Sequence, residues 1–466
     1  MSHSESTSAI HRPSMISRFS RTAIFVLLLA LPIIANLSFG SVTSGAFFFI
    51  AIAVSVIPAL WLGHSFSSGE FRLRLDMTQL AILGLIILGL IQLLPVGGVA
   101  IPEGILSSEP SSALSVDPNA TRLAIVRLFV FGVFYAAALT FLNHRDRIRT
   151  AVVVLIAFGS LMAFFAVLQF LSSPETILGF TPAAAARPYG TYVNRHHFAS
   201  LLVMIFAVAF AQLLMGGAKK DRLVFYLIAI LLLGTGVIFA GSRGAFLSLI
   251  AVLAFLGVGV LIVKRSKSGN RSEGGRSLLR NAAVLGISTI GFLLLLAFVA
   301  IWAGGEQELI RGAAMQTEGE DFSTGRIHFW TVALTIFVAN PVFGSGLESF
   351  GVAFTRFDTM NGLYRVEHAH NEYLQMLSDG GLIGLALVLF FIFFLFRGAQ
   401  RSIRSSREKF TAAASLGALA GCFGVLVHSV VDFPLRTNAN MFFFLLLAAI
   451  AIGNRNNGNP ERQRRA

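Results

Sequence analysis

Long apolar runs recur along almost the whole chain, and they decide what kind of fold it can have. Each run is close to the roughly 20 residues that an α-helix needs to cross the hydrocarbon core of a bilayer. Only 13% of the 466 residues are charged, about half the share found in soluble domains. The sequence therefore predicts an all-α polytopic membrane protein with about 12 transmembrane helices, at residues 22–40, 44–62, 77–95, 121–143, 150–171, 197–216, 223–241, 245–263, 282–303, 373–396, 410–431 and 440–453.

The basic residues indicate how these helices are oriented. Most of the 36 Lys and Arg residues, including every lysine, fall in segments that share one side of the membrane. Because cytoplasmic segments of membrane proteins are enriched in Lys and Arg, this side is predicted to be the cytoplasm. The predicted organisation is a cytoplasmic tail at 1–21, nine transmembrane helices over 22–303, one large loop on the outer side at 304–372, three transmembrane helices over 373–453 and a cytoplasmic tail at 454–466.

The net charge of +13 follows from the same distribution. Basic segments beside a membrane attract anionic lipid, so membrane lipids are expected partners and nucleic acid is not. The single cysteine, Cys422, lies inside an apolar run, which excludes intrachain disulfides and a cysteine-based metal site. The first apolar run has no convincing cleavage site after it, so we interpret it as a transmembrane helix rather than a removed signal peptide.

Two histidines and two carboxylates lie just before the tenth apolar run, in the stretch Glu367-His368-Ala369-His370-Asn371-Glu372. If a helix continues from Asn371, then His370, Gly381 and Gly384 fall on one stripe of it. This would place an imidazole at the mouth of a groove with a glycine floor, where another helix or a lipid chain can approach the backbone closely. The alternative without chemistry is an interfacial histidine above glycines that pack helices.

Two arginines on the predicted outer side are placed to bind an anion. Arg326 begins a predicted helix at 327–339 that is too short to span a bilayer, and the free N–H groups of its first turn would add to the site. Arg243 lies in the turn Gly241-Ser242-Arg243-Gly244, where small neighbours leave guanidinium and backbone accessible. Arginine forms a bidentate fork for phosphate, so the pair indicates a phosphate-bearing substrate. The alternative is that each arginine extends to lipid headgroups.

His368 and His370, together with Glu367 and Glu372, have spacing that a metal site could also use. Nothing in that spacing demands a metal, and arginines can neutralise a pyrophosphate without one, so no metal is expected. His428 and Asp432 are four residues apart, so the end of a helix would pair them, and we expect an orienting or structural role.

These motifs resemble the signature of the O-antigen ligase family of bacterial envelope glycosyltransferases. The resemblance consists of His370-Asn371 followed after nine residues by Gly381-x-x-Gly384, of Gly241 to Ala245, and of Gly325-Arg326 continuing through Trp330 and Pro341. It covers roughly residues 185–440.

The resemblance implies that a glycan is transferred from undecaprenyl pyrophosphate to an acceptor hydroxyl, on a glycan or on lipid A-core, at the periplasmic face of the bacterial inner membrane. Such transfer belongs to lipopolysaccharide or exopolysaccharide biosynthesis and needs no metal or other cofactor. Arg243 and Arg326 would bind the pyrophosphate, and His370 would be the catalytic base. His368, Asn371 and Glu372 are supporting candidates. Arg187 and Arg195 have no firm role in the signature and are candidates for contacts with acceptor or pyrophosphate.

Three other functions remain open at this point. The same superfamily contains polymerases of polysaccharide repeat units and protein O-oligosaccharyltransferases, and the sequence does not separate these from ligases. Some relatives are described as small-anion transporters, of bicarbonate for example. A transporter should carry ionisable groups near the middle of the membrane, whereas here the predicted helix centres are almost free of charge, which favours an enzyme.

Overall fold

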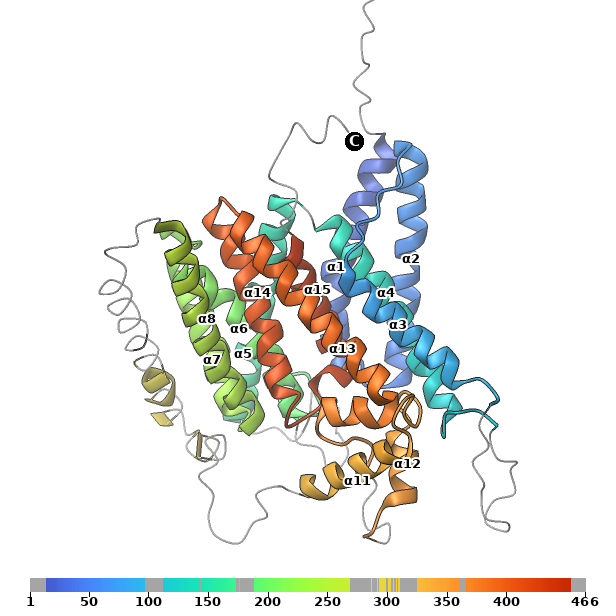
Figure 1. The fold of residues 1–466 in the computed structure, drawn as a ribbon. Helices are drawn as coiled ribbons and strands as arrows, with labels where there is room; N and C mark the ends of the chain where they lie inside the picture. Colours follow the sequence, from blue (N-terminus) through green and yellow to red (C-terminus); the bar gives the residue numbers. More distant parts are fainter. Residues whose placement is uncertain are drawn as a thin grey trace, which may run out of the picture.

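The computed structural model describes residues 14–96, 112–142, 144–172, 176, 188–268, 325–360 and 366–453, with isolated positions between 286 and 310. Over these residues the protein is helical and has no β-strand, which confirms the predicted all-α class. Figure 1 shows the long helices side by side in a bundle, with α11 and α12 at one end of it. The elements are α1 (Met15–Leu37), η1 (Phe39–Ser41), α2 (Ser44–Ser68), α3 (Met77–Gln92), α4 (Pro118–Phe141), α5 (Arg145–Ser172), α6 (Arg195–Leu214), η2 (Lys220–Arg222), α7 (Leu223–Phe239), α8 (Arg243–Ser268), α11 (Arg326–Ala339), α12 (Phe350–Phe357), α13 (Glu372–Ser405), α14 (Lys409–His428), η3 (Pro434–Arg436) and α15 (Asn438–Ile452).

Nine helices in the described part of the chain are long and apolar enough to cross a membrane, as a multi-pass membrane protein requires. At the predicted segments 77–95 and 440–453 the structure has the shorter apolar helices α3 and α15, of 16 and 15 residues. The predicted segment 282–303 and the first part of the predicted loop, up to residue 324, lie outside the described residues except for isolated positions. The same holds for the tail 454–466, and α1 begins inside the predicted tail 1–21.

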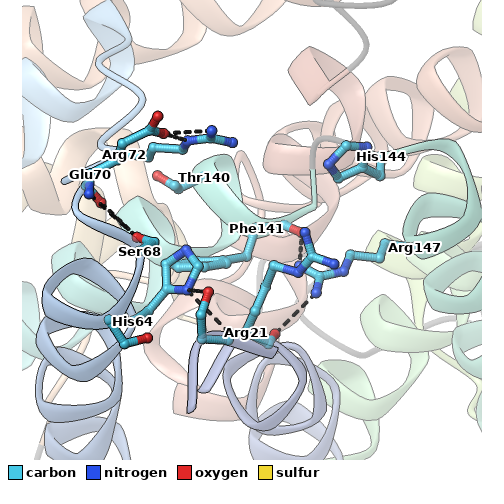
Figure 2. Close-up of a pocket in the computed structure, with 11 residues that line it drawn as sticks. Arg21, His64, Ser68, Glu70, Arg72, Thr140, Phe141, His144 and Arg147 are labelled. Atoms are coloured by element: carbon cyan, nitrogen blue, oxygen red, sulfur yellow. Dashed lines mark hydrogen bonds and ion pairs between the residues drawn. The ribbon is translucent and has the colours of Figure 1, made fainter. Parts of the chain in front are cut away.

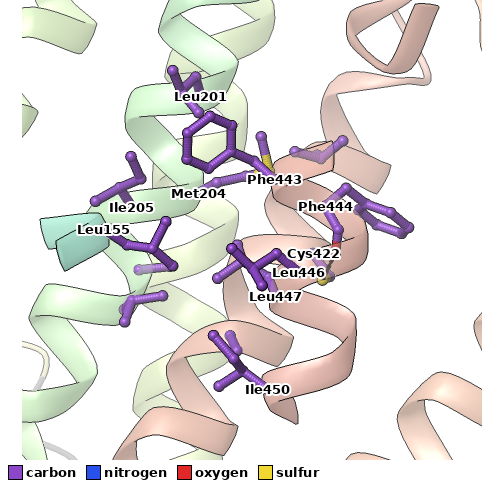
Figure 3. Packing of buried hydrophobic residues seen from close by; sticks show 14 of the residues in the cluster. Leu155, Leu201, Met204, Ile205, Cys422, Phe443, Phe444, Leu446, Leu447 and Ile450 are labelled. Atoms are coloured by element: carbon purple, nitrogen blue, oxygen red, sulfur yellow. Dashed lines mark hydrogen bonds between the residues drawn. The ribbon is translucent and has the colours of Figure 1, made fainter. Parts of the chain in front are cut away.

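α6 and α14 form the centre of the bundle, and most of each helix is buried by its neighbours. Their close contact depends on glycines of α14. A Cβ on Gly421 would lie 2.7 Å from the carbonyl oxygen of Met204, and one on Gly417 would lie 2.8 Å from Cα of Val208. Small residues spaced in this way allow two helix backbones to approach closely in a membrane protein. Figure 3 shows the apolar side chains of α15 packed beside this contact.

α13 is interrupted at Gly381, where φ is 62° and ψ is −161°. The turn that follows α11 fits into the break. The N–H groups of Leu382 and Ile383 donate to the carbonyl oxygens of Pro341 and Val342 at 2.9 and 3.3 Å, in place of bonds within the helix. The break satisfies the backbone groups that it frees, as the low-dielectric surroundings of a membrane protein demand. In consequence, the first part of α13 crosses the end of the bundle before the helix turns along it (Figure 1).

α11 and α12 pack against the segment before α13 through a small second core. Its buried members are Val332, Ala333, Ile336, Phe350, Ala353, Phe354, Val366 and Ala369. Nε2 of His328 on α11 lies 2.8 Å from Oδ1 of Asp358, the residue that ends α12. The predicted helix at 327–339 is therefore confirmed as α11, and it is held beside His370.

The α6–α14 contact predicts which glycines tolerate a methyl group. In Gly421→Ala the added Cβ meets backbone atoms of α6, so we expect overpacking to destabilise the protein by about 1–3 kcal/mol. Gly132→Ala on α4 is the matched control, because its Cβ would make only an ordinary contact, 3.5 Å from a side-chain atom of Ile82. Thermal unfolding of both variants in detergent measures the difference. Equal midpoints would contradict the close packing described for α6 and α14.

Candidate active site

His370 lies directly before α13, at the end of the bundle that carries α11 and α12. Its φ is 51°, a left-handed backbone conformation that residues other than glycine rarely adopt. The next residue fixes this geometry, because Oδ1 of Asn371 accepts hydrogen bonds from the N–H groups of Tyr373 and Leu374, both at 3.0 Å. Asn371, a predicted supporting residue, is thus the cap that begins α13.

The ring of His370 faces a buried carboxylate. Nδ1 of His370 is 3.3 Å from Oδ1 of Asp432, which lies in the connection between α14 and α15. This is an ion-pair distance, and the two groups are not aligned as a hydrogen bond. The Asp432 side chain is 4% exposed, whereas that of His370 is 32% exposed. The carboxylate is therefore shielded, while the imidazole can be reached from outside.

Two further histidines surround the same carboxylate. Nε2 of His197, from α6, lies 3.8 Å from Oδ1 of Asp432, and Nε2 of His428, from the end of α14, lies 3.9 Å from Oδ2. The backbone N–H of Phe433 donates to Oδ1 at 2.9 Å. Burial by itself would raise the pKa of Asp432, but its interactions with the rings of His197 and His370 hold that pKa well below the ordinary value. Asp432 is therefore ionised at neutral pH.

Aromatic rings determine which parts of His370 stay open. The ring of Phe329, from α11, is roughly parallel to that of His370 at 6.0 Å between centroids, and Phe433 meets it edge-on at 4.7 Å. His368 also packs on Phe433, at 4.3 Å. These contacts restrict the orientation of the imidazole, so Asp432 and the two phenylalanines together define where His370 points.

Arg326 reaches the site through α11. It is the first residue of that helix and follows Gly325, whose φ of 79° turns the chain into it. Phe329, one helical turn later, is the residue that stacks on His370. This contact holds the start of α11 at the histidine cluster. The start of a helix favours anions, so Arg326 and the helix terminus are suited to the same ligand.

Arg243 is the first residue of α8, which begins beside His428. Its neighbour Gly244 explains why small residues are needed there: a Cβ on Gly244 would lie 2.5 Å from Cδ2 and 2.6 Å from Nε2 of His428. Only glycine allows α8 to begin against this ring. The structure thus brings the starts of α8 and α11 to the histidines around Asp432, and with them the two predicted arginines.

The other predicted supporting residues have structural partners. His368 Nδ1 is 3.2 Å from Nε2 of Gln375, and burial, followed by the charge of Arg436, lowers the pKa of His368 to about 3. His368 is therefore neutral near pH 7 and poorly suited to accept a proton. Glu372 accepts a hydrogen bond from the N–H of Leu435 at 2.9 Å and pairs with Arg436. Arg195 is the first residue of α6, and Arg187 lies outside the described residues.

Arg436 is the residue that the sequence analysis did not single out. Its side chain is 15% exposed and lies 3.5 Å from both Glu372 and Asp379 and 3.7 Å from Glu348. Burial would lower the pKa of Arg436, but these three carboxylates raise it. The guanidinium therefore ties the connection between α14 and α15 to α13 and to the loop before α12. In the sequence, Arg436 is a single arginine in a predicted outer loop, and no local pattern indicates this role.

The predicted glycine groove is filled by protein. His370 precedes the helix, and the break at Gly381 interrupts the single stripe that was expected. A Cβ on Gly381 would collide with the backbone of Val342 and Gly344, and one on Gly384 would lie 3.0 Å from Sδ of Met376. The turn after α11 and a side chain of α13 itself contact these glycines, where a second helix or a lipid chain was expected.

An apolar cavity of about 190 Å³ adjoins the site on its α3–α4 side. Its walls are mostly aliphatic and aromatic side chains from α3, α4, α13 and α14, including Leu85, Leu128 and Val388. At its polar end lie Glu372, Arg436 and the pair of Arg127 with Glu348, 2.5 Å apart. The cavity is therefore a place where a lipid chain could lie close to the charged end of the site.

The alternative of a metal bound by His368, His370 and their neighbouring carboxylates finds no support in the geometry. In the described part of the chain no three His, Cys, Asp or Glu side chains surround a common point in a way that could hold a metal ion. His368 and Glu372 contact Gln375 and Arg436 instead.

The comparison with protein families agrees with this arrangement. Residues 228–389 match the family model described as O-Antigen ligase, and this stretch contains Arg243, Arg326 and His370. Asp432 and His428 lie beyond the match. No curated protein matches the chain. The resemblance drawn from the sequence motifs is confirmed over residues 228–389, which match the O-antigen ligase family model.

Proposed function

We propose that the protein is a glycosyltransferase that moves a glycan from undecaprenyl pyrophosphate to an acceptor hydroxyl at the periplasmic face of the bacterial inner membrane. The observation that carries the proposal is the His370–Asp432 pair, in which a partly exposed imidazole faces a buried carboxylate. The match of residues 228–389 to the O-antigen ligase family model supports it. The starts of α8 and α11 supply arginines beside the same cluster.

His370 acts as the general base. Nδ1 faces Asp432, so Nε2 is the nitrogen available to the acceptor. The acceptor oxygen forms its bond to the anomeric carbon of the donor as the bond from that carbon to the pyrophosphate oxygen breaks, and the hydroxyl proton passes to Nε2. Asp432 then faces the imidazolium and stabilises it, as a buried carboxylate does in other acid–base pairs. A histidine is suited to this task near neutral pH.

Arg243 and Arg326 bind the pyrophosphate. The leaving group departs with the bonding electron pair and carries more negative charge as it does so. Guanidinium groups at two helix starts can hold that charge without a proton transfer. Each helix start adds backbone N–H groups directed at the same ligand. This division of tasks needs no cofactor and no metal ion.

Ligase and polymerase activity differ in the acceptor rather than in this chemistry. A ligase would use a lipid A-core or another cell-surface acceptor, whereas a polymerase would use a second lipid-linked glycan. Supplying one or the other acceptor to the purified protein separates the two activities. We favour the ligase because the matched family is described as O-Antigen ligase.

Removing the proposed base should strongly reduce transfer and leave donor binding nearly unchanged. In His370→Ala we expect transfer to fall roughly a hundredfold or more, because general-base catalysis contributes on that scale. The ring lies at a partly exposed loop–helix junction, so expression and donor binding should stay near wild type. Transfer is measured with the purified protein in detergent. Wild-type rates in this variant would eliminate the proposed mechanism.

Arg326→Gln is the contrasting variant. A charge-assisted contact with the pyrophosphate exists before the transition state as well as in it, so donor binding itself should weaken about tenfold. Direct titration of a lipid-linked donor compares the two variants. If Arg326→Gln bound donor normally while His370→Ala did not, the two roles would have to be exchanged.

Asp432→Asn tests whether the carboxylate orients the ring of His370 and stabilises the imidazolium that forms during transfer. We expect transfer to fall about tenfold to a hundredfold, because the amide cannot stabilise the positive charge that forms on the imidazole as it takes the acceptor's proton. The amide keeps the size of the side chain. Gly132→Ala, far from the site in sequence, is the control for activity that is lost when any variant is expressed and purified. Transfer at the wild-type rate in this variant would reduce Asp432 to a packing role.

Accessibility tests the orientation that the proposal requires. Met360, after α12, and Asp221, in the η2 turn between α6 and α7, are exposed at opposite ends of the bundle. A cysteine at 360 should react with a membrane-impermeant maleimide in intact cells, and one at 221 only after permeabilisation. The native Cys422 is fully buried and contributes little background. The reverse pattern would place the site in the cytoplasm and overturn the proposed function.

A further inference from the structure

A second polar cavity lies at the end of the bundle opposite His370, where α2 and α4 end and α1 and α5 begin. It has a volume of about 330 Å³, and Figure 2 shows its side chains arranged around one space. The lining contains three arginines, two histidines and several hydroxyl groups. Its members are Ser17, Arg21, His64, Ser67, Ser68, Glu70, Arg72, Thr140, Phe141, His144 and Arg147. None of them belongs to the family match or to the site around Asp432.

The positive charge in this cavity is only partly compensated. Among the described lining residues Glu70 is the sole carboxylate, and it is already paired with Arg72, whose Nε donates to Oε2 at 2.7 Å. Arg147 donates to the carbonyl oxygens of Phe141 and Arg21 at 2.9 and 3.1 Å, so its guanidinium is fixed by neutral partners. Arg21 is exposed beside it. Arg21 and Arg147 thus line the same cavity, and among its described lining residues no carboxylate is left to pair with either of them, as an anion site requires.

The pKa of His144 reflects the same excess of positive charge in the cavity. The residue lies between α4 and α5, and its pKa is lowered by burial and then by the charges of Arg147, Arg21 and Arg72. His64 faces the cavity with Nδ1 engaged, 2.9 Å from Oγ of Ser17. Hydroxyl groups, guanidinium forks and ring nitrogens are all hydrogen-bond partners for phosphate oxygens.

Large apolar side chains flank the cavity and face outward. Phe19 is 67% exposed, Phe66 85% and Phe71 65%, and each stands within two residues of a lining residue. Phe19 and Phe66 belong to α1 and α2, two of the candidate membrane spans. Phe71 already stacks on Trp61 at 6.0 Å between ring centroids, so the other two rings are those that indicate the ligand. A free phosphate ion would use the basic cavity but not the exposed rings of Phe19 and Phe66. A phosphate that carries acyl chains would use both.

We propose that this cavity binds the headgroup phosphate of an anionic phospholipid from the cytoplasmic leaflet. Arg21 and Arg147 hold the phosphate, and the acyl chains run along the exposed phenylalanines. The assignment rests on the membrane orientation proposed above, which places this end of the bundle at the cytoplasmic headgroups. It is independent of the transfer chemistry, because none of the lining residues contacts the His370 site.

Lipid binding to the purified full-length protein tests this proposal. Phosphatidylglycerol is titrated into the protein in a neutral detergent, and native mass spectrometry counts the bound molecules, with phosphatidylcholine as the uncharged comparison. Arg21→Gln removes the charge but keeps the backbone carbonyl that Arg147 uses, and the exposed position allows the variant to fold. A charge-assisted hydrogen bond corresponds to about tenfold in affinity, so the tightest phosphatidylglycerol site should weaken about tenfold.

Arg18 provides the matched control. It is exposed on α1 three residues earlier and does not line the cavity, so Arg18→Gln makes the same charge change outside the site. We expect its phosphatidylglycerol affinity to stay within about twofold of wild type. Equal losses in both variants, or no loss in Arg21→Gln, would overturn the proposal. If soluble glycerol phosphate competed as well as the lipid, the ligand would be a free phosphate and the lipid assignment would be wrong.

Discussion

A carboxylate removed from water must be met by positive charge or hydrogen-bond donors, and the organisation of the end of the protein that carries His370 follows from that requirement. Asp432 is nearly inaccessible, and its partners come from three places: α6, the segment before α13, and the end of α14. Each of these elements must be in position for the charge to be tolerated. The short connection between α14 and α15 is therefore where the helices of the central bundle are tied to the segment that carries His370.

The same connection also holds a buried positive charge, four residues after Asp432. Arg436 is a buried cation, and it gathers carboxylates from the loop before α12 and from two turns of α13. Losing one partner of such a network leaves an uncompensated charge, so its members depend on one another. Asp432 and Arg436 together make the end of the bundle that carries α11 and α12 a connected polar unit. This unit surrounds a partly exposed histidine, and the mechanism we propose needs that combination of rigidity and access.

The glycines of α13 show how one sequence pattern can serve a different purpose from the expected one. Gly381 adopts a conformation that other residues avoid, and the chain uses it to open the helix and insert the turn after α11. Gln92, at the end of α3, secures that turn: its Nε2 donates to the carbonyl oxygens of Phe343 and Asp379, and its Oε1 accepts from the N–H of Leu347. The break directs the first part of α13 across the bundle and so brings His370 to Asp432.

The sequence by itself determined the features that depend on local pattern. Apolar runs of membrane-spanning length predict the helices, because each helix satisfies its own backbone, and the family motif identifies His370, Arg243 and Arg326 as candidates. The tertiary structure alone decided what surrounds them. His197 and Asp432 are far apart in sequence, and their contact exists only because α6 packs on α14. Arg436 and Gln92 likewise look ordinary in the sequence, since a buried charge or amide becomes meaningful only through partners that distant helices bring to it.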